Sequence, residues 1–165
     1  HYIGIDVVQR YIDAARKKID ATEFSGTGQL FCSGAETLHE IVDNHLPEGV
    51  EKSDVIVLYP FNCIGNMLQV EEVIGSLSKA GVGFLISSYQ TDLNANRIRF
   101  DYYLRCGYNE ITCRIDEKGV LFKAPEEGMQ TYAYHQEWML ETLKKHGITA
   151  KAVPFGPFGL GYVNA

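Results

Sequence analysis

The fold is decided by the stretch from Ser53 to Met67, SDVIVLYPFNCIGNM. Its first half, Asp54 to Tyr59, is a near-continuous apolar run, which is typical of a strand covered on both faces in a parallel sheet. Pro60 has no backbone N–H to donate to a sheet, so we expect the chain to turn outward there. The stretch therefore predicts a central parallel strand that ends in a loop rich in aromatic and carboxamide side chains.

Strands and helices alternate around this stretch. The alternation predicts right-handed crossovers and a parallel sheet with helices on both faces. After residue 107 the pattern changes, and a turn at Asp116 to Gly119 predicts an antiparallel hairpin. We expect one α/β domain over residues 1–165, with an antiparallel edge at its C-terminal end. Expected strands are 2–5, 29–32, 54–59, 82–88, 110–115, 120–123, 130–134, 148–154 and 160–164, and expected helices are 8–21, 37–45, 68–80, 94–106 and 136–146.

Composition narrows the classes of partner. The 165 residues are 45% hydrophobic and carry a net charge of −6. This charge makes a nucleic acid or an anionic membrane an unfavourable main partner, because phosphate binding depends on an excess of Lys and Arg. No apolar run reaches the roughly 18 residues of a membrane span, and no signal peptide is visible. The four cysteines form no C-x-x-C pair and lie in or beside apolar runs, as expected of buried or half-buried thiols in a reducing compartment. We expect a cytoplasmic protein.

Two loops at strand ends are candidates for ligand binding, because ligands of such sheets bind beyond the carboxyl ends of the strands. Asp6 follows the first strand, where a carboxylate accepts two hydrogen bonds from a ribose diol or caps the next helix. Ser33-Gly34-Ala35-Glu36 follows the second strand, and its small residues let backbone amides approach a flat ring. The alternative is an ordinary turn in which Glu36 serves only the helix N-terminus.

A third loop, from Tyr59 to Asn66, is the most unusual segment of the sequence. Its aromatic residues can wall an apolar or a cationic ligand. Asn62 and Asn66 can orient a polar acceptor without adding charge. The alternative is a rigid loop in which Phe61 and Ile64 simply plug the core.

The order of these three loops resembles the class I S-adenosylmethionine-dependent methyltransferases. IGIDVVQRYIDAARKK, from Ile3, is similar to that family's second strand and helix, and SGAE, from Ser33, to its adenine-side loop. SDVIVLYPFNCIGNM resembles its fourth strand and the loop that faces donor and acceptor, and EWMLETLKKHGITAKAVPF, from Glu137, its last helix and closing hairpin. The resemblance covers nearly the whole chain and implies a Rossmann-like sheet and S-adenosylmethionine as cofactor. The implied cofactor contacts are Asp6, Val7, Gly34, Ala35, Glu36, Tyr59, Pro60 and Phe61.

Two features differ from the family pattern. The family's first strand, with its glycine-rich turn, is absent, and residue 1 begins just after its place. We therefore expect a chain trimmed at its N-terminus, with a large apolar gap in the sheet. The adenine-side loop of the family often carries an acid where this chain has Gly34.

The resemblance implies methyl transfer, in which the enzyme mainly aligns the donor and acceptor and desolvates them. An amine acceptor needs only to be neutral, whereas a hydroxyl needs a base, for which His135 or His39 is a candidate. We expect Asn62 and Tyr59 at the reaction centre and no metal. The candidate substrate contacts are Asn62, Asn66, Tyr89, Arg97, Tyr132 and His135.

The loop PFNCIGN resembles that of small-molecule N-methyltransferases more than the Asn-Pro-Pro-aromatic loop of nucleic-acid amino-methyltransferases. It favours a small-molecule acceptor, with an amine preferred. The alternatives are another Rossmann-type enzyme such as a dehydrogenase, a non-catalytic or partner-completed domain, and an RNA (cap-type) methyltransferase. The sequence leaves open a homo-oligomer or a partner chain.

Overall fold

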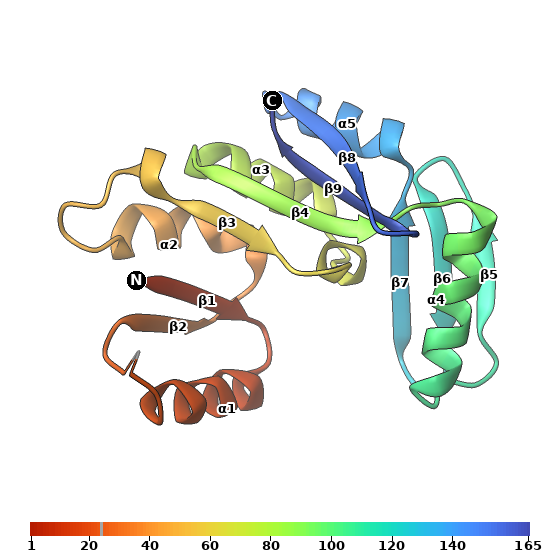
Figure 1. Cartoon of the computed structure of the whole chain (residues 1–165), viewed down its shortest axis with the longest axis horizontal. Coiled ribbons are helices and arrows are strands. Elements are labelled where there is room, and N and C mark those ends of the chain that lie inside the picture. Colours follow the sequence, from red (N-terminus) through yellow and green to blue (C-terminus); the bar gives the residue numbers. More distant parts are fainter. Residues whose placement is uncertain (24) are drawn as a thin grey trace.

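The computed structural model of the protein describes residues 1–23 and 25–165. Strands and helices alternate through its first half, and strands dominate the second half (Figure 1). In chain order the elements are β1 (Tyr2–Asp6), α1 (Gln9–Asp20), β2 (Gly28–Cys32), the short 3-10 turn η1 (Ala35–Thr37), α2 (Leu38–His45), η2 (Lys52–Asp54), β3 (Ile56–Tyr59), η3 (Cys63–Asn66), α3 (Val70–Ala80), β4 (Gly83–Tyr89), α4 (Leu93–Arg105), β5 (Thr112–Ile115), β6 (Gly119–Ala124), β7 (Met129–Tyr134), α5 (Gln136–Lys145), β8 (Ala150–Phe155) and β9 (Gly159–Asn164).

The described strands form three sheets. β1 and β2 are a parallel pair, and β3, β4, β9 and β8 form a second sheet in that order. In the second sheet β3 runs parallel to β4, while β9 and β8 close it as an antiparallel edge. The prediction of a mixed α/β sheet with an antiparallel C-terminal edge is therefore confirmed. The predicted gap is also present, because β1 lies on the side of β3 (Figure 1) and yet no hydrogen-bonded pairing joins the two strands.

The helices of the first half pack on different partners. α1 joins the parallel strands β1 and β2 and packs on both of them. α2 in turn packs on α3, so these two helices line the same side of the molecule.

The main core lies between the four-stranded sheet and the helices α2, α3 and α5. Phe84 and Ile86 of β4 are buried there against Ile74 and Leu143. The intervening residue Leu85 points to the opposite face because side chains alternate along a strand. The sequence predicted that this opposite face would also be covered, but the described residues leave it open. Ile56 and Leu58 of the apolar run are exposed by 70% and 64%, and Leu85 is 37% exposed. Val153 and Phe155 of β8 are each 44% exposed. The apolar run correctly indicated a strand, but it did not indicate which segments pack on each face of that strand.

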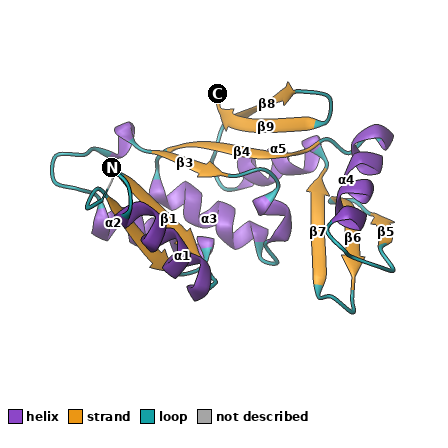
Figure 2. Ribbon diagram, turned by 60° about the horizontal axis from the view of Figure 1, so that its bottom comes forward, coloured by secondary structure: helices purple, strands orange, loops and turns teal. Residues whose placement is uncertain are grey.

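The remaining strands form a sheet of their own instead of extending the edge. β5, β6 and β7 are an antiparallel sheet, seen beside α4 in Figure 2. Tyr103 of α4 packs with Val120 and Phe122 of β6 in a small separate core. The sheet is tied to the main body through β7, which contacts η3 and β4.

The cysteines were expected to be buried or half-buried, and only one of them is. Cys63 is half-buried, but Cys32, Cys106 and Cys113 are exposed, because they lie at a strand end, a helix end and an edge strand. None of the helices in residues 1–23 and 25–165 is both long and apolar enough to cross a membrane.

Gly65 fixes how closely η3 approaches β7. A Cβ atom at this position would lie well inside 3.0 Å of the Tyr132 carbonyl oxygen, a backbone atom that cannot rotate away. We expect Gly65→Ala to lower the free energy of unfolding by about 1–3 kcal/mol, as overpacking does, measured by urea denaturation. The matched control is Gly75→Ala in α3, where the new Cβ meets only the His146 side chain at 3.4 Å. That variant is expected to be equally stable or more stable by about 0.5–1 kcal/mol, and equal losses in both variants would contradict the packing role of Gly65.

Candidate functional site

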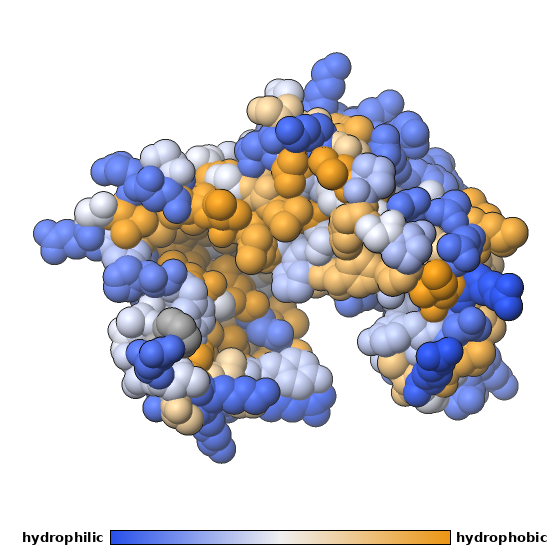
Figure 3. Space-filling view, viewed as in Figure 1, coloured by the Kyte–Doolittle hydropathy of each residue, from blue (hydrophilic) through white to orange (hydrophobic). Residues whose placement is uncertain are grey.

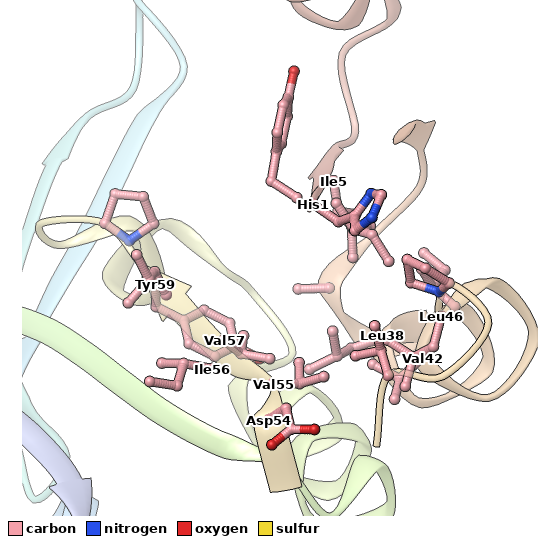
Figure 4. Close-up of a pocket in the computed structure, with 18 of the residues that line it drawn as sticks. His1, Ile5, Leu38, Val42, Leu46, Asp54, Val55, Ile56, Val57 and Tyr59 are labelled. Carbon is pink, nitrogen blue, oxygen red and sulfur yellow. The ribbon is translucent and has the colours of Figure 1, made fainter. Parts of the chain in front are cut away.

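An apolar groove separates β1 from β3. It has a volume of about 510 Å³ and is bounded by both strands, with α2 as its floor. Figure 3 shows an apolar recess in this part of the molecule, and Figure 4 shows β3 side chains across open space from those of β1 and α2. Its apolar lining includes Ile3, Ile5, Leu38, Val42, Leu46, Val55, Ile56, Val57, Leu58 and Tyr59.

Asp6 is the last residue of β1 and follows Ile5, which lines the groove. Its Oδ1 accepts a hydrogen bond of 2.7 Å from the Val8 N–H, so the carboxylate supports the start of α1. No other described residue bonds the carboxylate, and its second oxygen retains its acceptor capacity. The two alternatives raised by the sequence are thus compatible: a helix-start ligand and a ribose ligand. Asp6, Val7 and Cys32 meet at one sheet end, since Asp6 is paired with Cys32 and the Cys32 thiol contacts the Val7 carbonyl.

The loop after β2 is a tightly bonded turn. Thr37 Oγ1 donates to the Gly34 carbonyl oxygen at 2.9 Å and also lies 2.8 Å from Ser33 Oγ. The Glu36 carboxylate folds back over Gly34, into the space that a Cβ atom would take. This turn directs Ala35 into the groove, where it lies in one cavity with Tyr59 and Pro60. The structure therefore brings together predicted cofactor residues from two different strand ends, whereas Asp6, Val7, Gly34, Glu36 and Phe61 do not line that cavity.

Tyr59 is the last residue of β3 and is buried. Its hydroxyl oxygen has no hydrogen-bond partner among the described residues. Burial raises the pKa of the Tyr59 phenol well above its ordinary value, and the nearby Cys63 adds to this. Tyr59 therefore stays a neutral phenol at physiological pH and is a donor rather than a base.

Asn62 holds the loop after β3 in place. It is only 4% exposed, and its backbone is left-handed, with a φ of 56°. The side-chain amide donates to Thr131 Oγ1 of β7 at 3.0 Å, and the carbonyl oxygen accepts from Ser88 Oγ of β4 at 3.0 Å. Because both ends of the carboxamide are bonded within the protein, Asn62 positions the loop between two sheets.

A second cavity, of about 730 Å³, lies on the other side of this loop. Pro60 lines the groove and the next residue, Phe61, lines the second cavity, so the loop separates the two. The walls of this second cavity come from that loop, the end of β4, α4 and the residues that follow it, and β7. None of the described lining residues is an aspartate, glutamate, histidine, lysine or arginine. The lining residues are Phe61, Asn62, Asn66, Tyr89, Tyr102, Tyr103, Cys106, Tyr108, Gly128, Met129, Gln130 and Thr131.

Aromatic rings give this cavity a rigid edge. The Phe61 ring meets Tyr89 edge-to-face with centroids 4.4 Å apart, and Phe158 stacks on Tyr89 at 5.8 Å. Such pairs are stabilised beyond their buried area. Burial raises the pKa of the Tyr89 phenol to about 12, with Tyr103 adding to the rise and Arg99 opposing it.

Arg99 lies behind these rings and was not singled out by sequence reasoning. It is fully buried in α4, and its guanidinium donates to the carbonyl oxygens of Val120 and Thr131 at 3.2 Å each. The Arg99 Cζ lies 5.2 Å from the Tyr89 ring centroid, and burial lowers the pKa of the guanidinium. The signal was present in the spacing, since Ala95, Arg99 and Tyr103 recur every four residues and share one helix face. Arg97, which was singled out, lies on another face and is exposed.

Two further predicted substrate residues lie outside the second cavity. The Tyr132 hydroxyl donates to Asp116 at 2.9 Å, and its ring stacks on Tyr134, so its side chain faces away from Thr131. His135 precedes α5 and its Nδ1 lies 2.9 Å from Thr91 Oγ1. The other candidate base, His39, lies against Ser76 Oγ at 2.9 Å between α2 and α3. Asn66, Tyr89 and Asn62 are the predicted substrate residues that the cavity brings together.

Comparison with known proteins gives a result at the level of the fold. No protein-family model matches the chain, and no curated protein matches its sequence.

Among the described residues, no group of three or more His, Cys, Asp or Glu side chains is placed to hold a metal ion.

Solved structures do resemble the whole chain. The PH0226 protein of Pyrococcus horikoshii has a TM-score of 0.63 at 13% identity and covers 99% of this chain and 71% of its own. An O-methyltransferase family protein of Burkholderia thailandensis has a TM-score of 0.58 at 16% identity, covering 99% of this chain and 42% of its own. An S-adenosylmethionine-dependent methyltransferase of Mesorhizobium loti has a TM-score of 0.57 at 13% identity, covering 99% and 80%.

These identities show the fold and not the reaction. The cyclase SpnF also resembles the chain, with a TM-score of 0.53 at 12% identity. The shared architecture nevertheless agrees with the resemblance that the sequence motifs indicated. The chain has the fold of the S-adenosylmethionine-dependent methyltransferases.

Proposed function

We propose that this chain forms the catalytic fold of an S-adenosylmethionine-dependent methyltransferase that acts on a small molecule. The observation that carries the proposal is the loop from Tyr59 to Asn62, whose consecutive residues Pro60 and Phe61 line two cavities. In-line methyl transfer requires a donor and an acceptor that meet at one point from opposite sides. In this proposal the two cavities hold the donor and the acceptor on either side of the loop, and the reacting atoms meet past the edge of the loop, because its backbone would block a direct path. A cytoplasmic location is part of the same proposal.

The cofactor lies, in this proposal, at the carboxyl ends of β1, β2 and β3. Asp6 offers its second carboxylate oxygen to the ribose hydroxyls, and the turn containing Gly34 and Ala35 offers a flat surface to the adenine. Tyr59 and Pro60 face the same cavity as Ala35. When bound, the cofactor supplies an activated methyl group, so these residues need only to bind, orient and exclude water.

The acceptor lies in the cavity behind Phe61 and is an amine that is neutral when it reacts. The cavity has no carboxylate or histidine to deprotonate an alcohol, and the Tyr89 phenol, with a pKa of about 12, keeps its proton. The buried guanidinium of Arg99 behind Tyr89 disfavours a permanently cationic acceptor. Asn66 and Gln130 offer uncharged hydrogen-bonding groups to the amine.

A second candidate function is a non-catalytic domain that has retained the fold. The open groove between β1 and β3 favours a non-catalytic domain. No sheet hydrogen bonds among the described residues join the two strands whose ends would hold the cofactor. Absence of S-adenosylhomocysteine binding by the chain would support this candidate over the methyltransferase.

Asp6 provides the first test of the methyltransferase proposal. We expect saturable binding of S-adenosylhomocysteine in isothermal titration calorimetry. Asp6→Ala should weaken this binding by about 1–3 kcal/mol through lost hydrogen bonds to the ribose. Because Asp6 also bonds the Val8 N–H, the alanine variant is also expected to lose some thermal stability without ligand.

Asp6→Ser is the matched control for the helix-start role. Serine retains an acceptor for the Val8 N–H but has no carboxylate, so we expect near-parent stability together with weakened cofactor binding. Parent-like affinity in both variants would contradict the ribose role of Asp6.

The acceptor assignment predicts a distinct pH dependence. In methylation assays with radiolabelled S-adenosylmethionine and a panel of primary amines and matching alcohols, we expect product from amines alone. The rate should rise with pH through the pKa of each acceptor amine, because only its neutral form attacks, and should not follow a histidine pKa.

His135→Ala is expected to leave the amine rate within about twofold, since His135 lies outside the cavity walls. Methylation of an alcohol near neutral pH that is lost in His135→Ala would overturn the amine assignment in favour of base-assisted hydroxyl methylation.

A further inference from the structure

Arg99 carries a positive charge that no described residue neutralises. Its side chain is fully buried, and it takes part in none of the ion pairs between described residues. Two of its N–H groups donate to the carbonyl oxygens of Val120 and Thr131, whereas its Nε has no hydrogen-bond partner among the described residues. An arginine stays protonated in proteins, and a buried charge without an ionic partner is costly. An anion bound near Arg99 would reduce this cost.

The second cavity is the space in which such an anion fits. Tyr89 and Thr131 line it and both contact Arg99. The Tyr89 ring centroid lies 5.2 Å from the Arg99 Cζ, and the Thr131 carbonyl oxygen accepts from the guanidinium at 3.2 Å. A single layer of wall residues therefore separates the guanidinium from the cavity. None of the described lining residues is charged, so no carboxylate of the wall competes with a ligand for the attraction of Arg99.

The rest of the wall suits a flat ligand. Five of the described lining residues are aromatic, namely Phe61, Tyr89, Tyr102, Tyr103 and Tyr108. Ring centroids lie 5.3 Å apart for Tyr102 and Tyr103 and 6.1 Å apart for Tyr103 and Tyr108, in edge-to-face pairs. An aromatic ligand can extend this arrangement through further ring pairs. The Tyr89 phenol keeps its proton, because its pKa is raised to about 12, and can donate a hydrogen bond to a carboxylate.

We propose that the second cavity binds a small aromatic carboxylate, with its ring among the tyrosines and its carboxylate on the side of Tyr89 and Arg99. Arg99 selects the charge of the ligand without touching it, and Tyr89 holds the carboxylate by a hydrogen bond. The acceptor is then an aromatic amine that carries a carboxylate, such as an aminobenzoate, and this identification of the acceptor rests on the proposed function. Aromatic amines are neutral at physiological pH, as the amine assignment requires.

Three ligands of one shape separate the effect of charge from that of packing. Benzoate, benzamide and benzamidine are flat and nearly isosteric, and at neutral pH they are negative, uncharged and positive. The whole chain is titrated with each ligand, without S-adenosylmethionine, and binding is followed by amide chemical shifts. We expect benzoate to bind at least tenfold more tightly than benzamide, and benzamidine not to reach saturation. The shifts should be largest at Met129, Gln130 and Thr131, which line the cavity.

Two arginines of α4 give a matched pair of variants. Arg99→Met removes the buried charge, and Arg97→Met removes an equal charge from an exposed position on another face of the helix. We expect benzoate and benzamide to bind within about twofold of each other in Arg99→Met, and the preference for benzoate to stay at least tenfold in Arg97→Met. Arg99→Met also loses two hydrogen bonds, but a smaller folded fraction lowers both apparent affinities equally and leaves their ratio unchanged.

Gln130→Glu tests the same charge effect with Arg99 intact. The substitution adds a carboxylate to the cavity wall at nearly constant volume and leaves both hydrogen bonds of Arg99 in place. We expect benzoate to bind at least tenfold more weakly than to the parent, because the new carboxylate repels it, and benzamide to bind within about twofold of the parent. If Arg99→Met does not fold, this variant and the ligand series decide the question.

Four results would each overturn the proposal. These are equal affinities for benzoate and benzamide in the parent, an unchanged affinity ratio in folded Arg99→Met, an unchanged benzoate affinity in Gln130→Glu, and largest shifts away from the cavity. Binding of S-adenosylhomocysteine without a preference for benzoate would overturn the carboxylate site alone. A preference for benzoate without binding of S-adenosylhomocysteine would overturn the proposed function alone.

The class of acceptor has its own measurement. With radiolabelled S-adenosylmethionine, we expect para-aminobenzoate to be methylated with a kcat/KM at least tenfold above that of para-aminobenzamide, and we expect Arg99→Met to remove this difference. Equal kcat/KM values for the two amines in the parent would overturn the aromatic amino acid as the acceptor.

Discussion

The Asn62 carboxamide is the contact on which the arrangement of the two cavities depends. It bonds Ser88 of the four-stranded sheet with its oxygen and Thr131 of the three-stranded sheet with its nitrogen. The left-handed backbone at Asn62 makes this reach possible, and asparagine adopts that conformation more readily than most residues. Because both sheets are bonded to one buried side chain, Phe61 and Asn66 are held at fixed positions in the cavity wall. Asn62 thus holds the loop in place, and its expected role at a reaction centre stays a prediction.

On the other side of the loop, the β1–β2 pair is attached to the rest of the molecule by fewer direct bonds. The β1–β2 pair shares no sheet hydrogen bonds with β3, and η1 and α2 connect it to the rest of the molecule by packing on α3. Asp6 and Ala35 belong to that pair and its following turn, whereas Tyr59 belongs to β3. Their relative placement therefore depends on helix packing. A firmly held second cavity and a less constrained groove follow from the same topology.

Local patterns in the sequence predicted the elements closely but not their neighbours. Apolar alternation, the turn at Asp116 to Gly119 and the glycines after helices located the elements because each signal depends on residues near in sequence. Exposure of Ile56 and Leu58 depends on which chain segments cover β3, which no local signal reports. The same reason explains why Tyr132 was expected at the substrate cavity and Thr131 was not. Side-chain alternation along β7 places the two residues on opposite faces of the strand, but it does not indicate which face meets Asn62.

Arg99 is a buried charge that lies behind the wall of the second cavity without lining it. Its guanidinium is held by two β-sheet carbonyl oxygens, and the rings of Tyr89 and Phe122 lie across its face at 5.2 and 4.5 Å. Burial without a carboxylate partner is costly, and burial lowers the pKa of the guanidinium accordingly. The carbonyl dipoles and the aromatic faces offset part of that cost. Tyr89, whose ring lies over Arg99, also lines the second cavity, so the positive charge lies behind a wall that itself carries no charged residue. This positive charge is therefore held by the packing of α4 against β6 and β7, and not by a residue that lines the cavity.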